Sequence, residues 1–276
     1  MSTSRLGVCS WSLRPDSPAD LVAKVRETGL DAIQLALDPI RSGAWSYDET
    51  VATLRDSGIT ILSGMMGMAG EDYTSLDSIK RTGGVRPDAT WPANLAATNG
   101  NAELAKRLEI PLVTFHAGFI PHDTRDSEHT KMIERLRKIA GAFDRHGVRV
   151  AFETGQETAD TLLAALDELE RPEVGVNFDP ANMILYGMGD PVEALRRLAP
   201  RVAQIHIKDA NPSKLPQTWG SEVVVGTGAV DWPAFFEVVR DERIDCDLVI
   251  EREAGDSRVA DIIAARKLVE SLRSSD

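Results

Sequence analysis

Five side chains that can bind metal ions or move protons directly follow or interrupt short apolar runs: His116, Glu153, Asp179, His206 and Glu251. The three carboxylates and His206 form an oxygen-rich donor set. Such a set suits one divalent ion, Mn²⁺ first, with Mg²⁺, Co²⁺ or Zn²⁺ as alternatives. A divalent ion held by a carbonyl and the neighbouring hydroxyl acidifies the C–H bond between them, and a ligand carboxylate can then move the proton.

A single carboxylate at the end of a strand is more often a helix cap or a turn residue, and Asp179-Pro180 alone could be one. Four or five such residues in register on consecutive strands are harder to explain in this way. Buried carboxylates without partners would cost several kcal/mol, and a divalent cation removes that penalty. We therefore predict a metal site.

Short apolar runs that position these residues alternate with longer amphipathic segments, and eight runs are what a closed parallel barrel needs. We predict strands at Leu6–Cys9, Ala32–Ala36, Thr60–Leu62, Leu112–Phe115, Val148–Phe152, Val174–Phe178, Val202–Ile207 and Asp247–Ile250. We predict helices at Pro18–Thr28, Tyr47–Ser57, Trp91–Leu108, Ser127–His146, Thr158–Leu169, Pro191–Ala199, Trp232–Asp241 and Arg258–Leu272.

This alternation predicts an α/β fold, a (β/α)₈ TIM barrel that occupies residues 1–276 as a single domain. A doubly wound open sheet is the alternative, but the first turn, Ser10–Pro15, contains no GxGxxG. Gly226-Thr227-Gly228 is expected to be only a turn. The long connections Ser63–Thr90 and Asp209–Asp231 follow strand ends, where lids and pocket walls of barrels lie.

Composition restricts the partners and the location. The formal net charge of −12 disfavours binding of nucleic acid, because such binding depends on Lys and Arg neutralising phosphates. No apolar run approaches the roughly 18 residues of a membrane span, and the polar N-terminus resembles no signal peptide. Cys9 and Cys246 lie in apolar stretches, as reduced thiols do in the cytoplasm. We expect a cytoplasmic protein with no membrane partner.

The chain resembles the xylose isomerase-like TIM barrel superfamily, in particular its sugar phosphate isomerase/epimerase family and the D-tagatose 3-epimerase-like members. The resemblance covers almost the whole chain. It depends on the segments Phe152-Glu153, Asn177-Phe178-Asp179-Pro180-Ala181-Asn182, Ile205-His206-Ile207-Lys208-Asp209, Gly226-Thr227-Gly228-Ala229-Val230-Asp231-Trp232 and Ile250-Glu251-Arg252-Glu253.

The resemblance implies that Glu153 and Glu251 are metal ligands and also the acid/base pair, acting from opposite faces of a sugar through a cis-enediolate. It implies that Asp179 and His206 are ligands only. Asn182 stands where those epimerases have a His, and Lys208 follows the ligand His where they have an Arg. These differences disfavour a free ketohexose as substrate. Barrels of this family often dimerise, so a homodimer is one alternative for the quaternary structure.

Further residues are candidates for substrate binding. His116 could donate a hydrogen bond to substrate, ligate the metal or be a satisfied core residue. Lys208 could stabilise an enolate oxygen or pair with Asp179 or Glu153, and Asn182 could contact a metal-bound water or the substrate. Gln34, interpreted as the end of the second strand, could hold a sugar hydroxyl. Two more candidates have structural alternatives, sugar stacking or core packing for Trp11 and substrate contact or a solvent-facing cap for Glu157.

We predict a metal-dependent isomerase or epimerase that acts on a keto-sugar or related small carbohydrate, with Glu153 and Glu251 as acid/base pair. The first alternative is a metal-dependent lyase or dehydratase of a keto-inositol or 3-keto-sugar. The second is a non-catalytic sugar-binding barrel. Endonuclease IV-like cleavage of DNA needs many more His ligands than this chain offers, since it has five His in all.

Overall fold

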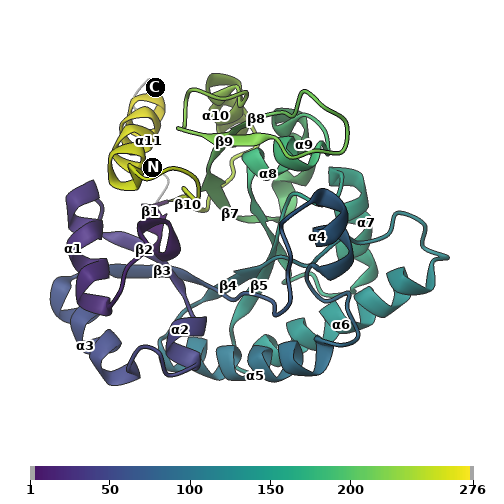
Figure 1. Cartoon of the computed structure of the whole chain (residues 1–276), viewed down its shortest axis with the longest axis horizontal. Helices are drawn as coiled ribbons and strands as arrows, with labels where there is room; N and C mark the ends of the chain where they lie inside the picture. Colours follow the sequence, from purple (N-terminus) through teal and green to yellow (C-terminus); the bar gives the residue numbers. More distant parts are fainter. Residues whose placement is uncertain (1–3, 274–276) are drawn as a thin grey trace.

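The computed structural model describes residues 4–273, in which eight parallel strands close into a barrel (Figure 1). The strand order is β1-β10-β7-β6-β5-β4-β3-β2, and β1 closes the ring by pairing with both β10 and β2. The strands are β1 Leu6–Cys9, β2 Ala32–Ala36, β3 Thr60–Met65, β4 Leu112–Phe115, β5 Arg149–Glu153, β6 Gly175–Phe178, β7 Val202–Ile207 and β10 Asp247–Ile250. The predicted TIM barrel is confirmed.

An outer ring of helices covers the strands (Figure 1). The helices of the described chain are α1 Pro18–Thr28, α2 Asp38–Arg41, α3 Tyr47–Ser57, α4 Leu76–Thr82, α5 Trp91–Arg107, α6 Ser127–Asp144, α7 Ala159–Glu168, α8 Pro180–Tyr186, α9 Pro191–Leu198, α10 Trp232–Asp241 and α11 Arg258–Arg273, with 3₁₀ turns η1 Ser10–Leu13 and η2 Ala199–Arg201. None of the described helices is long and apolar enough to cross a membrane.

Local sequence explains how these helices begin, end and face the barrel. In α1, the Ser17 side chain accepts a hydrogen bond from the Asp20 N–H, Pro18 occupies the first turn and Gly29 ends the helix at φ 74°. In α6, apolar residues at three- and four-residue spacing, such as Leu136 and Phe143, are fully buried.

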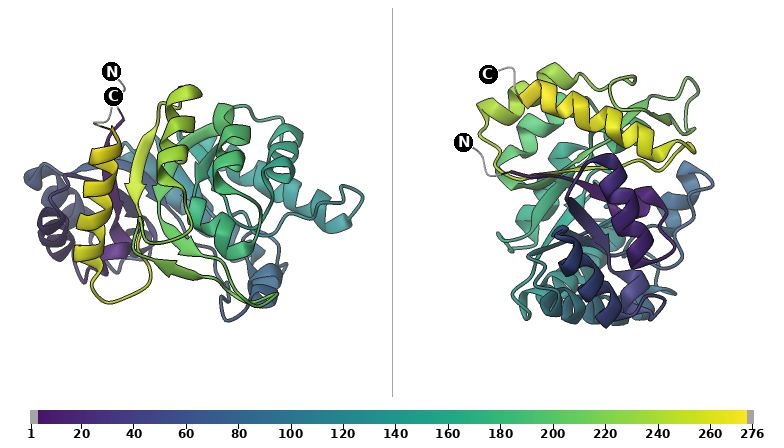
Figure 2. Two further views of the ribbon diagram at one scale, coloured as in Figure 1. Left: turned by 90° about the horizontal axis from the view of Figure 1, so that it is seen from above. Right: turned by 90° about the vertical axis from the view of Figure 1, so that its left-hand side faces the viewer.

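Several elements were not predicted, and all of them follow the carboxyl end of a strand: α2, α4, α8, and a hairpin of β8 (Asp209–Asn211) and β9 (Ser221–Val223). α4 lies in the connection Ser63–Thr90, and the hairpin lies in Asp209–Asp231. Both extend over the same end of the barrel (Figure 2), where the Trp219 indole donates a hydrogen bond to the Tyr73 carbonyl at 3.2 Å. The two long connections therefore build the mouth together.

The hairpin is anchored by the buried carboxylate of Asp209. This carboxylate accepts hydrogen bonds from the backbone N–H groups of Gly226 (2.9 Å), Gly228 (3.1 Å) and Val230 (3.2 Å) and from the Trp232 indole (3.0 Å). A Cβ at Gly228 would lie 2.1 Å from Asp209 Oδ1, so only glycine fits there. The GxG segment thus binds a carboxylate of its own chain.

The substitution Asp209→Asn should destabilise the fold, because the amide keeps one acceptor oxygen and turns an N–H₂ group toward N–H donors. We expect a loss of about 1–3 kcal/mol in the free energy of unfolding, measured by urea titration. Asp241→Asn, at an exposed carboxylate ending α10, is the matched control and should change stability by less than about 0.5 kcal/mol. Equal effects of the two substitutions would contradict the anchoring role.

Candidate active site

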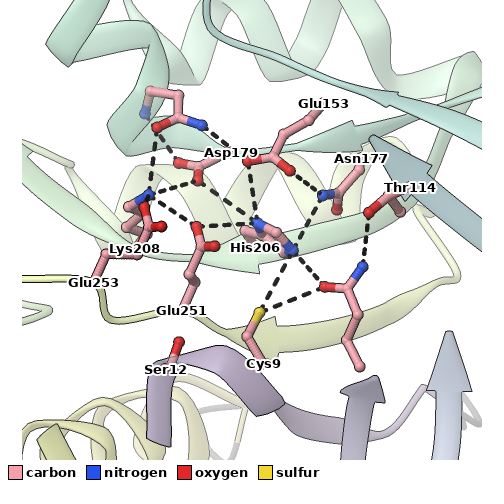
Figure 3. A network of polar contacts seen from close by, with 12 residues as sticks. Cys9, Ser12, Thr114, Glu153, Asn177, Asp179, His206, Lys208, Glu251 and Glu253 are labelled. Atoms are coloured by element: carbon pink, nitrogen blue, oxygen red, sulfur yellow. Dashed lines mark hydrogen bonds and ion pairs between the residues drawn. The ribbon is translucent and has the colours of Figure 1, made fainter. Parts of the chain in front are cut away.

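The carboxyl ends of four neighbouring strands bring Glu153, Asp179, His206 and Glu251 together, and we call these four residues the tetrad (Figure 3). Glu153 ends β5, Asp179 follows β6, His206 lies in β7 and Glu251 follows β10. One donor atom of each lies within 4.8 Å of the others, and all four residues are buried. His206 Nδ1 lies 3.5 Å from Glu153 Oε1, 3.7 Å from Asp179 Oδ2 and 3.4 Å from Glu251 Oε2.

Two buried atoms of the tetrad, Asp179 Oδ2 and His206 Nδ1, have no hydrogen-bond partner in the described structure. Buried polar atoms are nearly always satisfied, and a cation bound between this pair and the two further carboxylates would satisfy both atoms. Asp179 also caps α8, because its other oxygen, Oδ1, accepts from the Asn182 N–H at 3.0 Å. The capping and ligand interpretations of Asp179 are therefore compatible, with one oxygen for each. The donor set and its geometry fit one divalent ion.

A hydrogen bond behind the imidazole selects the tautomer that a ligand needs. Gln34 Nε2 donates to Thr114 Oγ1 at 2.8 Å and lies 3.4 Å from the Gly64 carbonyl, which orients the amide so that Oε1 points to His206. Gln34 Oε1 lies 2.7 Å from His206 Nε2, so the imidazole donates from Nε2. The lone pair of Nδ1 then faces the three carboxylates, as metal ligation requires.

The sequence predicted that Gln34 ends its strand, and the structure shows that it does not. It is the third of the five residues of β2, and it is fully buried beneath the tetrad. Its carbonyl and its amide N–H₂ are both engaged inside the barrel, and it is not among the residues that line the cavity. This position suits orientation of His206 and leaves no free group for a sugar hydroxyl.

Asn177 belongs to the same inner layer and was not singled out from the sequence. Its amide N–H₂ donates to Glu153 Oε2 at 3.2 Å, and its carbonyl accepts from Gln204 at 3.1 Å. Gln204 in turn accepts from the Ser63 hydroxyl. In the sequence, this hydrogen-bond network is indicated only by polar residues that interrupt predicted strands.

Lys208 lies two residues beyond His206, and its side chain points to the same side of β7, toward β10. Its ammonium lies 2.8 Å from Glu251 Oε2, 2.6 Å from Glu253 Oε2 and 3.8 Å from Asp179 Oδ2. The predicted pairing with Asp179 is thus the weakest of the three contacts. The main partners are carboxylates of the neighbouring strand end.

Three other predicted residues meet the tetrad at the mouth. Asn182 Nδ2 donates to Glu153 Oε1 at 2.9 Å, and the Trp11 indole donates to Glu251 Oε1 at 2.8 Å. Trp11 lies in the 3₁₀ turn η1, just beyond β1. His116 Nε2 lies 3.6 Å from Glu153 Oε1. All three line one cavity of about 480 Å³ that opens above the tetrad, together with residues of both long connections.

Glu157 is buried outside the cavity, so the prediction of a solvent-facing cap is wrong. Its side chain is 4% exposed, its carboxylate accepts from the Ile120 N–H at 3.3 Å, and it is not among the residues lining the cavity. Burial raises the pKa of Glu157 to about 8. The path of the loop after β5, which turns inward here, could not be inferred from local sequence.

Charges within the site shift the pKa values of its acids apart. Burial by itself raises the pKa of Glu251, but the charge of Lys208 and its hydrogen bond hold it well below its usual range. The pKa of Glu153 is lowered against the same burial effect, chiefly by His116. For Asp179 burial dominates over the attraction of Lys208 and raises the pKa to about 6. Glu153 and Glu251 are therefore ionised near neutral pH.

The tetrad predicts a single high-affinity site for a divalent ion. Titration of chelator-treated protein with Mn²⁺ in a calorimeter should give one equivalent bound. Asp179→Asn keeps the helix cap and removes an anionic ligand, so we expect affinity to fall at least about a hundredfold. Glu157→Gln, at a buried acid outside the tetrad, is the control and should bind like the wild type. Undiminished binding by the Asn variant would exclude Asp179 as a ligand.

Glu157 also predicts a pH effect on stability. Since its folded pKa of about 8 lies above the ordinary 4.5, the folded state keeps a proton that the unfolded state releases between these pH values. Stability from this group is complete below pH 4.5 and is lost as the pH rises toward 8. Relative to Glu157→Gln, the wild type should lose a few kcal/mol between pH 5 and 8 in urea unfolding. Parallel pH profiles would contradict the buried neutral acid.

Comparison with known proteins agrees with this architecture. The model of the family described as xylose isomerase-like TIM barrel matches residues 22–274. A xylose isomerase domain protein from Planctomyces limnophilus is 30% identical, with a TM-score of 0.85 over 91% of this chain and 92% of that one. No curated protein matches the sequence.

More distant structures share the fold. An L-ribulose 3-epimerase is 18% identical, with a TM-score of 0.74 over 98% of this chain and 96% of its own. The probable 3-DHS dehydratase AsbF from Bacillus anthracis is 20% identical, with a TM-score of 0.71 over 96% and 98%. On the match of the family model and the nearly full-length similarity at 30% identity, the chain belongs to the xylose isomerase-like TIM barrel family.

Proposed function

We propose that this protein is a metal-dependent isomerase or epimerase of a keto-sugar or related carbohydrate. The observation that carries the proposal is the placement of two buried carboxylates, Glu153 and Glu251, on strands that are separated by β6 and β7. Both reach the same imidazole nitrogen, and both retain an ionised form near neutral pH. Two bases that approach one carbon from different sides can remove a proton and return one on the opposite face.

The four residues of the tetrad would hold the ion, with Mn²⁺ as the first choice for this donor set and Mg²⁺, Co²⁺ or Zn²⁺ as alternatives. When bound, the ion supplies the positive charge that acidifies a C–H bond next to a carbonyl. Asp179 and His206 take no part in proton transfer in this scheme and serve only as ligands. Asp179 is held in place by its capping bond to α8, and His206 is held by Gln34.

Neighbouring side chains orient the two bases. Asn177 and Asn182 each donate to one oxygen of Glu153, so the carboxylate is held by both of its oxygens. Trp11 and Lys208 do the same for Glu251. Lys208 also stands beside the cavity, where its ammonium can donate to an oxygen of the substrate that gains negative charge.

A lyase is the second candidate, supported by the fold similarity to a probable dehydratase. The same proton abstraction would then be followed by loss of a β-hydroxyl or other leaving group. The two outcomes differ in their products. Incorporation of solvent deuterium without loss of water supports isomerisation, whereas an unsaturated ketone supports the lyase.

Replacing either base by its amide tests the roles. In Glu153→Gln and Glu251→Gln we expect the rate of deuterium exchange at the carbon next to the carbonyl to fall at least about a hundredfold, because proton transfer by a positioned group contributes that much or more. The exchange is followed by NMR in D₂O with a panel of ketoses, inososes and 3-keto-sugars. Circular dichroism should show folded variants.

Glu253→Gln is a comparison at the same mouth, since Glu253 pairs with Lys208 but lies outside the tetrad. A smaller loss of exchange is expected there than in either tetrad variant. Near-normal exchange in Glu153→Gln or Glu251→Gln would show that the acid/base assignment is wrong. Ligand binding that survives removal of the metal, with no exchange by the wild type, would favour a non-catalytic sugar-binding barrel.

A further inference from the structure

The basic groups of the cavity above the tetrad are already engaged by acids of the chain. Among the residues that line it in the described part of the chain, Lys208 is the single Lys or Arg. Its ammonium is held between Glu251 and Glu253 at 2.8 and 2.6 Å. Phosphate and carboxylate groups are recognised by Arg or Lys side chains whose charge is not already neutralised, and this lining offers none.

Apart from His116, which faces Glu153 at 3.6 Å, the remaining ionisable acids and bases of the lining are carboxylic acids and tyrosines. Asp38 pairs with Arg41 at 2.9 Å, and Glu222 pairs with Arg252 at 2.7 Å. Glu71 accepts from the Gly84 N–H and from the Tyr73 hydroxyl. The lining therefore offers no excess of positive charge to an anionic group.

One wall of the cavity is aromatic and built from separate elements. Tyr186 ends α8, Trp219 precedes β9, and their rings pack edge to face with centroids 4.9 Å apart. The Trp219 indole is tied to the Tyr73 carbonyl, which fixes the ring over the mouth. Met65, Met66 and Met68 also line the cavity. Methionine side chains adapt to flat apolar groups and make favourable contacts with rings.

The cavity has room for more than the reacting part of a carbohydrate. Its volume of about 480 Å³ lies within the range of roughly 300–1,000 Å³ that accommodates drug-sized ligands. Asn182 and Lys208, which contact the tetrad, could bind the oxygen atoms of the reacting part of the substrate. The aromatic wall lies on the connections that form the mouth.

On the basis of the proposed function, we infer that the substrate is an uncharged keto-sugar carrying an aryl substituent, with no phosphate or carboxylate. The carbonyl end faces the tetrad and the aryl group packs against Tyr73, Tyr186 and Trp219. Trp219 is then a specificity-determining residue. The chemistry at the carbonyl carbon is unchanged by this assignment, which concerns only what the rest of the cavity recognises.

The test compares three forms of each parent in the panel of ketoses, inososes and 3-keto-sugars: the parent itself, its phosphate ester and its phenyl ether or glycoside. Affinity for the Mn²⁺-loaded protein is measured by calorimetry, and deuterium exchange by NMR. We expect the phenyl form to bind at least about tenfold more tightly than the parent, and the phosphate ester to bind more weakly than the parent.

Variants assign the preference to the aromatic wall. Trp219→Ala should reduce the ratio of phenyl to parent affinity at least about fivefold, and Trp219→Phe should restore most of it because a ring remains. Leu215→Ala is the matched control, since Leu215 is 67% exposed in the same connection and does not line the cavity. It should leave the ratio unchanged.

Two kinds of failure are distinguishable. Tighter binding of the phosphate ester, or an unchanged ratio in Trp219→Ala, would overturn this inference while deuterium exchange with the parent still supported the proposed function. If no member of the panel binds or exchanges, the proposed function falls and the substrate assignment falls with it.

Discussion

The burial of three neighbouring carboxylates sets the electrostatics of this barrel. Glu153, Asp179 and Glu251 lie around His206 in a space from which solvent is almost excluded. Lys208 is the nearest permanent positive charge, and it contacts Glu251 closely but Asp179 only at 3.8 Å. A divalent ion at the centre would balance the two remaining negative charges and would satisfy the two orphaned atoms of the tetrad.

The unusual interior of the barrel follows from the same constraint. Barrel interiors are normally filled with branched apolar side chains, yet here Gln34, Thr114, Asn177 and Gln204 are completely or almost completely buried beneath the tetrad. Each of them is hydrogen-bonded, and the network ends on Glu153 and His206. Figure 3 shows Thr114 and Asn177 beside these two residues. Burying so many amides is tolerable only because they satisfy one another, and the outcome is a fixed orientation for two members of the tetrad.

The fold could be predicted from the sequence because every strand is a short apolar run and most outer helices have amphipathic spacing. β1, β2, β4, β7 and β10 have the predicted bounds, while β3 extends to Met65. The elements that were missed, such as α4 and the hairpin of β8 and β9, are short and depend on tertiary contacts. Asp209 shows why: its partners lie 17 to 23 residues away along the chain.

The convergence of the tetrad was predictable because the ends of parallel strands meet at one mouth of a barrel. The supporting residues were harder to assign. Gln34 and Glu157 were given the wrong surroundings, since local sequence does not say whether a polar residue points into the barrel or whether a loop turns inward. The aromatic wall was not predicted for a similar reason. Tyr73, Tyr186 and Trp219 come from three connections, and their contacts depend on the complete fold.

The central claim is that the tetrad holds one divalent ion, and an anomalous difference map tests it most directly. Crystals grown with Mn²⁺ would be measured on both sides of the manganese absorption edge. The account predicts one strong peak among Glu153, Asp179, His206 and Glu251, in contact with Nδ1 of the imidazole. A map without a peak there, or with the ion bound at another site while Nδ1 stays unligated, would contradict it.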